Sequence, residues 1–119
     1  MALNWDLERS AIGAVFTLSG YLSDDDVDRL EGATGWVAGK TDAVVLDLSA
    51  LQGCSLRAQK VLGRFVVGLA PRVVVCGASP NRLPLHDVRF DGIQRAKTRS
   101  AALTTLNAIP PREQPRVAP

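Results

Sequence analysis

The 119-residue sequence predicts an α/β domain in which a mixed β-sheet of four to five strands packs against about four helices. Two short runs with strand character come first, and Ile12-Gly13 between them suits a β-hairpin. Two continuous apolar runs, residues 43–47 and 72–77, each follow a segment with helical spacing. Because strand–helix–strand crossovers are right-handed and pair their strands in parallel, an initial hairpin followed by βαβ units makes the sheet mixed.

The first half of the chain contains the hairpin and one helix. Residues 3–9 alternate apolar and polar side chains, which is typical of a half-buried strand, and residues 14–19 form a second strand that ends at Gly20. Ser23 is a good N-cap, and the three aspartates after it suit a solvated first helical turn. The helix ends near Gly39-Lys40, and its buried face is expected to comprise Val27, Leu30, Ala33 or Thr34, and Val37.

The second half continues with a buried strand, residues 43–47, a brief apolar loop and a helix that Ser55 caps. The buried stripe of this helix is expected to be Ala58, Leu62, Phe65 and Leu69. Residues 72–77 form a strand, residues 78–81 a turn, residues 88–93 a weak extended segment and residues 98–107 a last helix. Residues 1–108 are therefore one domain, and residues 109–119 a Pro-rich flexible C-terminal tail.

Four short motifs occur in order along the chain: Gly20-Tyr21-Leu22, Val44-Val45-Leu46-Asp47-Leu48-Ser49, Val73-Val74-Val75-Cys76-Gly77 and Ala101-Ala102-Leu103. Together they resemble the STAS domain, the fold of bacterial anti-sigma factor antagonists, over nearly the whole chain. That resemblance implies a STAS-like fold and a non-catalytic protein–protein interaction module, active as an antagonist in transcription regulation. Its implied partner is an anti-sigma factor or a related kinase-like ATPase protein.

The phosphorylation site of the family is degenerate in this sequence. The family usually continues from its Asp-Leu-Ser motif to Asp-Ser-Ser-Gly-Leu, and its switch is the first Ser after the second Asp. Counted without gaps from Asp47, that switch position falls on Leu56, and the preceding Asp falls on Ser55. Ser55 could accept a phosphate if a kinase tolerated a shift of one residue, but we favour Ser55 as a helix cap.

The candidate partner-binding residues are Ser55, Arg57, Lys60 and Arg64. The three basic residues are spaced i, i+3, i+7 and are expected to project together from the second helix, which the resemblance implicates in kinase binding. Such a stripe suits an acidic partner surface, whereas the alternative is a solvated helix face. For the protein as a whole there are two alternative functions. One is a STAS subunit that docks on a transporter ATPase, and the other is a nucleic-acid-binding module. Few aromatic residues and no recognised motif disfavour nucleic acid as a partner.

Charge is unevenly distributed: residues 1–54 carry nine acidic and three basic side chains, whereas residues 55–119 carry eleven basic and three acidic ones. We expect the two halves to intermix in space, so that this polarity largely cancels. A weak homodimer is compatible with the sequence. No apolar run is long enough to span a bilayer, and residues 1–6 do not look like a signal peptide, so a cytoplasmic location with reduced thiols is expected.

No pattern in the sequence indicates catalysis, a metal or a cofactor, so none is predicted. His86 beside Asp87 is interpreted as a surface pair. Asp47 could be a catalytic acid at a strand end, but we favour an Asx-type turn with Ser49. Cys54 precedes a helix N-terminus that could activate its thiol, but we favour a small buried apolar side chain.

Overall fold

The computed structural model describes residues 4–77 and 93–110. They form one five-stranded sheet in the order β1 (Asn4–Arg9), β2 (Ala14–Leu22), β3 (Val44–Cys54), β4 (Val73–Cys76) and β5 (Gln94–Ala96). Strand β1 pairs antiparallel with β2, and every later pairing is parallel, as the hairpin and the βαβ units predict. The helices are α1 (Val27–Lys40), α2 (Leu56–Leu69) and α3 (Arg99–Ala108), with a short 3₁₀ turn, η1 (Asp24–Asp26), before α1.

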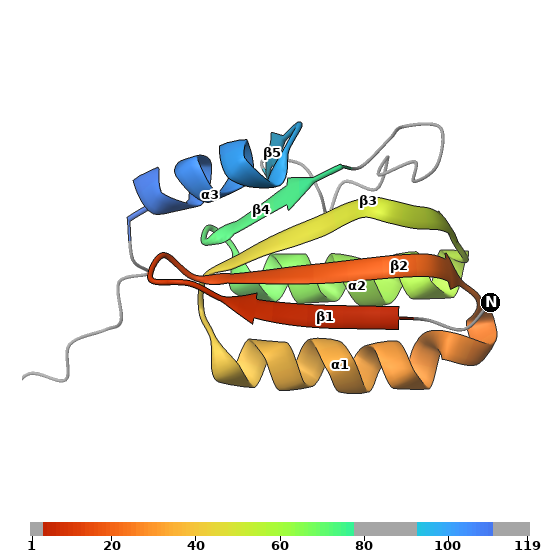
Figure 1. Cartoon of the computed structure of the whole chain (residues 1–119). Coiled ribbons are helices and arrows are strands. Elements are labelled where there is room, and N and C mark those ends of the chain that lie inside the picture. Colours follow the sequence, from red (N-terminus) through yellow and green to blue (C-terminus); the bar gives the residue numbers. More distant parts are fainter. Residues whose placement is uncertain (1–3, 78–92, 111–119) are drawn as a thin grey trace, which may run out of the picture.

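The sheet separates two apolar cores of unequal size. Helices α1 and α2 cover one face, and α3 covers part of the other (Figure 1). Because side chains alternate along a strand, Val44 and Leu46 of β3 enter the larger core, whereas Val45 enters the smaller one. The predicted stripes of both helices are buried, including Leu62, and Ala33 and Thr34 are both buried in α1.

Helices α2 and α3 each begin after a serine or threonine N-cap, as the N-cap rules predict, and Ser23 caps the 3₁₀ turn η1 that precedes α1. The Ser55 hydroxyl accepts a hydrogen bond from the Ala58 N–H at 3.2 Å, and Thr98 caps α3 through the N–H of Ala101 at 3.1 Å. At Ser23 the N–H donates to the Asp26 carboxylate at 3.2 Å, as in a capping box. Asp26 is consequently buried, which corrects the expectation that all three aspartates are solvated.

Two strands are longer than predicted. Strand β3 runs to Cys54 and includes the segment expected to be a loop, and β2 passes through Gly20 to Leu22. Each strand extends because the other pairs with it: β2 and β3 are parallel partners up to their ends. Their register shifts near Ser19 and again after Gly20. Gly20 has a φ of 87°, so it allows the irregularity that keeps the pairing instead of ending the strand.

The helix count is also corrected, because the described residues hold three α-helices where about four were expected. None of the helices in this described part is long and apolar enough to cross a membrane. The predicted turn at residues 78–81, most of the segment 88–93, the pair His86 and Asp87, and the tail from residue 111 lie outside the described residues. Ile109, just past the predicted domain boundary, is buried in the smaller core.

Ion pairs join the acidic first half of the chain to the basic second half. The guanidinium of Arg64 lies 3.2 Å from Glu31, that of Arg72 lies 3.8 Å from Asp42, and that of Arg99 reaches both Glu8 and Asp47. The halves therefore intermix in the fold, and much of the sequence-level polarity cancels.

Candidate protein-binding site

The predicted site lies at the end of the molecule where β2 and β3 stop and α2 begins. Leu22 pairs with Cys54 in the last rung of the two strands, and the N–H of Ser55 donates to the Leu22 carbonyl at 2.8 Å. This bond fixes where the chain leaves the sheet, and the Ser55 cap fixes where the helix starts. The first turn of α2 is therefore held rigidly against the sheet end.

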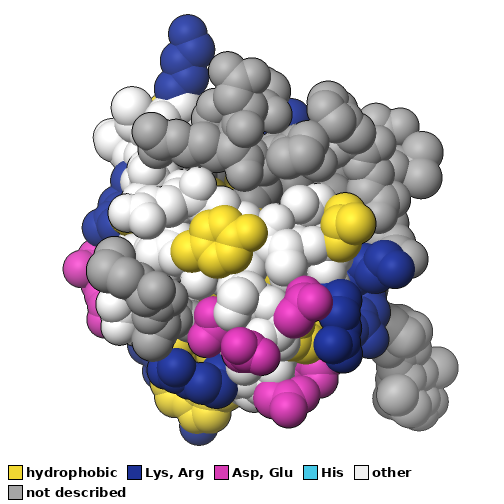
Figure 2. Space-filling model, turned by 90° about the vertical axis from the view of Figure 1, so that its right-hand side faces the viewer, with side chains coloured by type: hydrophobic (Ala, Val, Ile, Leu, Met, Phe, Trp, Pro, Cys, Tyr) yellow, Lys and Arg dark blue, Asp and Glu magenta, His cyan; other side chains and the backbone are white. Residues whose placement is uncertain are grey.

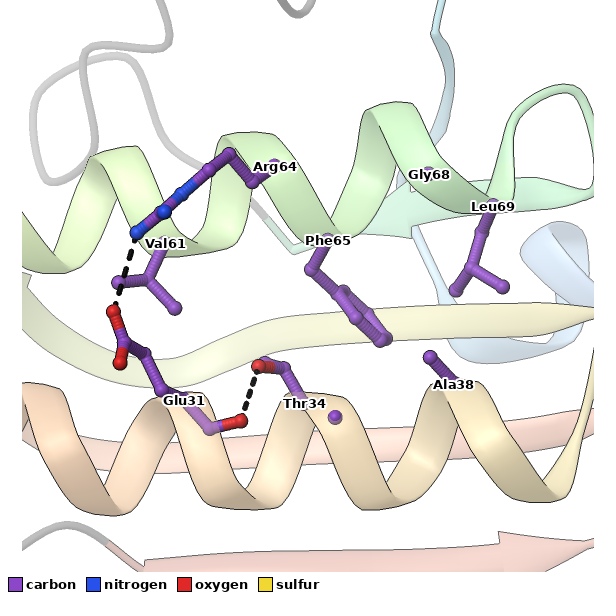
Figure 3. Close-up of a pocket in the computed structure, with 9 residues that line it drawn as sticks. Glu31, Thr34, Ala38, Val61, Arg64, Phe65, Gly68 and Leu69 are labelled. Atoms are coloured by element: carbon purple, nitrogen blue, oxygen red, sulfur yellow. Dashed lines mark hydrogen bonds and ion pairs between the residues drawn. The ribbon is translucent and has the colours of Figure 1, made fainter.

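Leu56 is the first residue of α2, and its side chain is 75% exposed. Arg57 and Lys60 are exposed on the same helix, as predicted. Arg64 is also exposed, but its guanidinium is turned toward α1 and pairs with Glu31 (Figure 3). The basic stripe is thus divided: two cations near the helix start face solvent, and the third is engaged within the domain.

Tyr21 adds an exposed aromatic ring at the same end of the molecule. Its partner in the sheet is Gly53, and a Cβ atom at Gly53 would lie 2.6 Å from Cε2 of the ring. Because Gly53 has no side chain, the Tyr21 ring can lie across β3 at this position. Tyr21 remains 48% exposed. Figure 2 looks onto this end and shows hydrophobic side chains set apart on a polar surface, with carboxylates gathered next to them.

Asp47 has a structural role on the sheet. Its Oδ1 accepts bonds from the Ser49 N–H at 3.0 Å and the Ser49 hydroxyl at 2.7 Å, which confirms the predicted Asx-type turn. Its Oδ2 accepts two bonds from Arg99, from Nε at 3.2 Å and Nη2 at 3.0 Å. Burial raises the pKa of Asp47, but the bonds from Ser49 and Arg99 outweigh it, so the net pKa lies below the usual value of 3.8.

The two cysteines are poor nucleophiles in this setting. Burial raises the pKa of the Cys54 thiol to about 12, which favours its interpretation as a small apolar side chain. Burial, together with the neighbouring Asp47 carboxylate, also raises the pKa of Cys76 to about 12. Across residues 4–77 and 93–110, no group of His, Cys, Asp and Glu side chains has the arrangement of a metal site.

No protein-family model matches the sequence, and no curated protein matches it either. Solved structures do match. An anti-sigma factor antagonist from Mycobacterium paratuberculosis superposes with a TM-score of 0.75 at 26% identity, covering 88% of this chain and 94% of that one. The antagonist SpoIIAA in its unphosphorylated form gives a TM-score of 0.66 at 17% identity, over 89% and 100% of the two chains. A STAS domain from Rhodobacter sphaeroides gives 0.53 at 19% identity, over 69% and 97%. The chain has the fold of a STAS domain.

Three contributions to the surface and core of this domain were missed by sequence reasoning. Arg99 lies 52 residues from Asp47, and no local pattern links them. Glu31 became the partner of Arg64 only through the packing of α1 beside α2. In the sequence Tyr21 stands out only as part of a Gly-x-Leu motif, whereas in the structure it lies opposite Gly53, and an aromatic residue opposite a glycine in paired strands is a recognisable signal.

Proposed function

We propose that this STAS domain is a non-catalytic binding module of the anti-sigma factor antagonist type, and that its partner is an anti-sigma factor or a related kinase-like ATPase protein. The observation that carries the proposal is the exposed Leu56 at the start of α2, at the position where the family has its phosphorylated serine. The similarity to the Mycobacterium paratuberculosis antagonist supports the kind of partner.

The surface has the composition of a small protein interface. Leu56 and Tyr21 are exposed apolar anchors, since a large side chain that gains full burial on binding contributes most of the affinity. Ser55 holds the first turn of α2 in place, and Arg57 and Lys60 supply positive charge at its rim. Rim charges act mainly on the association rate and on orientation. Arg64 contributes at the far end of the stripe, where Glu31 already holds it.

Phosphorylation does not control this surface in our proposal. Leu56 has no hydroxyl, and the Ser55 hydroxyl already accepts the capping bond from Ala58. A capping bond typically contributes about 1 kcal/mol to helix stability, so a phosphoryl group on Ser55 would disturb the helix start. The module then binds constitutively, and the abundance of its partner sets the response.

The test is calorimetric titration of the purified chain with each anti-sigma factor and kinase-like ATPase protein of the same genome. Leu56→Asp should weaken binding at least tenfold, because it places a charge where the apolar anchor is buried. Val67→Asp is the matched control, since Val67 is also exposed on α2 but lies near its other end, and it should leave affinity unchanged. Equal loss in both variants, or no binding to any of these proteins, would remove the proposal.

Incubation with the bound kinase and ATP, followed by intact-mass measurement, tests the constitutive state separately. No added phosphate is expected on the wild-type chain. A stoichiometric phosphate on Ser55 would show that the switch has moved by one residue and is still present.

A further inference from the structure

The outer side of the helix layer carries an apolar groove of about 380 Å³ between α1 and α2. Phe65 and Leu69 of α2 point into it (Figure 3). The groove is also lined by residues with no side chain or only a methyl group: Gly35, Ala38 and Gly68. The ion pair between Glu31 and Arg64 borders the groove on the side of the helix starts. The groove therefore presents apolar surface to solvent beside a charged border.

The outward face of α1 carries a stripe of three glycines, with the exposed Asp28 in line with them one turn nearer the helix start. Gly32, Gly35 and Gly39 are exposed, and a Cβ atom added to any of them would meet nothing within 4 Å. At about 100° per residue, the three positions share a stripe of about 60° on the helix. Glycine in a helix interior is unfavourable relative to alanine, and no contact within the domain requires it here. The stripe leaves the backbone of α1 open to close approach.

Trp36 lies on one flank of this stripe, and the groove lies on the other. The indole of Trp36 is 47% exposed, with its ring 5.8 Å from that of Trp5 and with Lys40 5.7 Å from its centroid. Ala38 and Glu31, which line the groove, fall on the opposite flank at about 100° per residue. A half-exposed aromatic side chain and an apolar groove thus flank the glycine stripe of one helix, one on either side.

We propose that the domain forms a two-fold symmetric homodimer through α1, with Trp36 of each copy in the α1–α2 groove of the other. A two-fold axis that runs parallel to the glycine stripe exchanges its two flanks. The Trp36 flank of each copy then faces the groove flank of the other, so the same contact forms twice. The glycines let the two α1 backbones meet. This proposal is independent of the partner-binding surface, which lies at the end of the domain where α2 begins.

Charge on the two flanks agrees with this arrangement. The Trp36 flank carries Arg29 and Lys40, whereas the groove flank carries Glu31 on α1. Exchange of the flanks brings the basic side of each copy toward the acidic side of the other, whereas Asp28, which lies in the stripe itself, comes near its counterpart at the start of α1.

Strand β1 offers the main competing surface, because it is an edge of the sheet. Asp6 and Glu8 point to the same face of that strand, since residues two apart do. Symmetric antiparallel pairing of two copies of β1 places these carboxylates close to their counterparts. Charges on an edge strand are a common protection against such pairing, so β1 is disfavoured as the dimer contact.

The experiment is sedimentation velocity of the full chain over a wide range of concentrations, from micromolar to near millimolar. The wild type should show a reversible monomer–dimer equilibrium. Gly35→Leu should shift the dissociation constant upward by at least tenfold, because its side chain separates the two helices. Trp36→Ala should also raise the dissociation constant at least tenfold, because it removes the indole that occupies the groove of the other copy. Leu56→Ala is the control, an exposed apolar residue outside this face, and should leave the equilibrium unchanged.

Folding and association are separable in these variants. Gly35→Leu has open space around its side chain and improves helix propensity, so its thermal midpoint should equal or exceed that of the wild type. A wild type that sediments only as a monomer overturns the proposal. A dimer that persists in both Gly35→Leu and Trp36→Ala overturns it as well, and assigns self-association to another surface such as β1.

Discussion

Replacing Arg99 with leucine tests whether the contact between α3 and the sheet stabilises this domain. The Asp47 side chain is only 6% exposed, and Arg99 donates two hydrogen bonds to its Oδ2. Arg99→Leu leaves that oxygen without these donors, while Ser49 still serves Oδ1. A hydrogen bond to a charged group typically contributes about 1.5–3 kcal/mol. Because the Arg99 side chain is 42% exposed and its charge is screened, we expect a loss of about 1–2 kcal/mol in the free energy of unfolding at pH 7.

The pH dependence of this loss identifies its origin. The pKa of Asp47 is lower in the folded domain than its usual value of 3.8, so its stabilising contribution is present above that value and lost as pH falls through the folded pKa. Arg99 stays protonated throughout, because its pKa is raised by the hydrogen bonds to Asp47. The destabilisation by Arg99→Leu should therefore shrink below about pH 4.

Urea denaturation of wild type and variant at pH 7, 5, 4 and 3 measures this effect. Arg57→Leu is the control, because it removes an exposed cation that has no assigned role in stability. A loss for Arg99→Leu that is the same at pH 7 and pH 3 would refute the reasoning, since protonation of Asp47 removes the interaction. A loss no larger than that of Arg57→Leu would mean that the pair contributes nothing.

Three further predictions follow from the packing and the charges. Leu62→Ala should destabilise the domain by about 2–5 kcal/mol and Lys60→Ala by no more than about 0.5 kcal/mol, and comparable denaturation midpoints would mean that the faces of α2 are misassigned. Gly77→Ala should lower the free energy of unfolding by about 1–3 kcal/mol in the same assay. Gly77 has a φ of 75°, and a Cβ atom there would lie 2.5 Å from a backbone nitrogen of β3. An unchanged denaturation midpoint would contradict this prediction. Lys60→Glu combined with Arg57→Glu should slow association with the partner identified by calorimetry and weaken its salt dependence in stopped-flow measurements. Unchanged rates would exclude this helix face.

Local patterns were sufficient for much of the site. Ser55 was identified as a cap because a serine before an amphipathic segment satisfies a free helical N–H, and the structure confirms that bond. The buried stripe that includes Leu62 follows from helical spacing alone. The Asp47 turn was equally local, since its partner lies two residues away. Each of these features depends on atoms that are close in sequence.

The features that sequence reasoning missed depend on pairings between distant segments. Strand β3 continues to Cys54 because β2 offers a parallel partner for its whole length, and strand length in a sheet is a property of the pair. The turn of Arg64 toward Glu31 required α1 and α2 to pack side by side.

The sequence by itself therefore determined the order of strands and helices, the helix starts, the buried faces and the absence of a hydroxyl at Leu56, since these follow from residue type and short-range spacing. Only the tertiary structure decided that Arg99 bonds to Asp47, that Trp36 and a groove flank one glycine stripe, and that Leu56 and Tyr21 share one end of the domain. The physical reason is that sheet register and helix packing minimise exposed apolar area over the whole chain. The neighbours that a side chain acquires in this way depend on all the elements together.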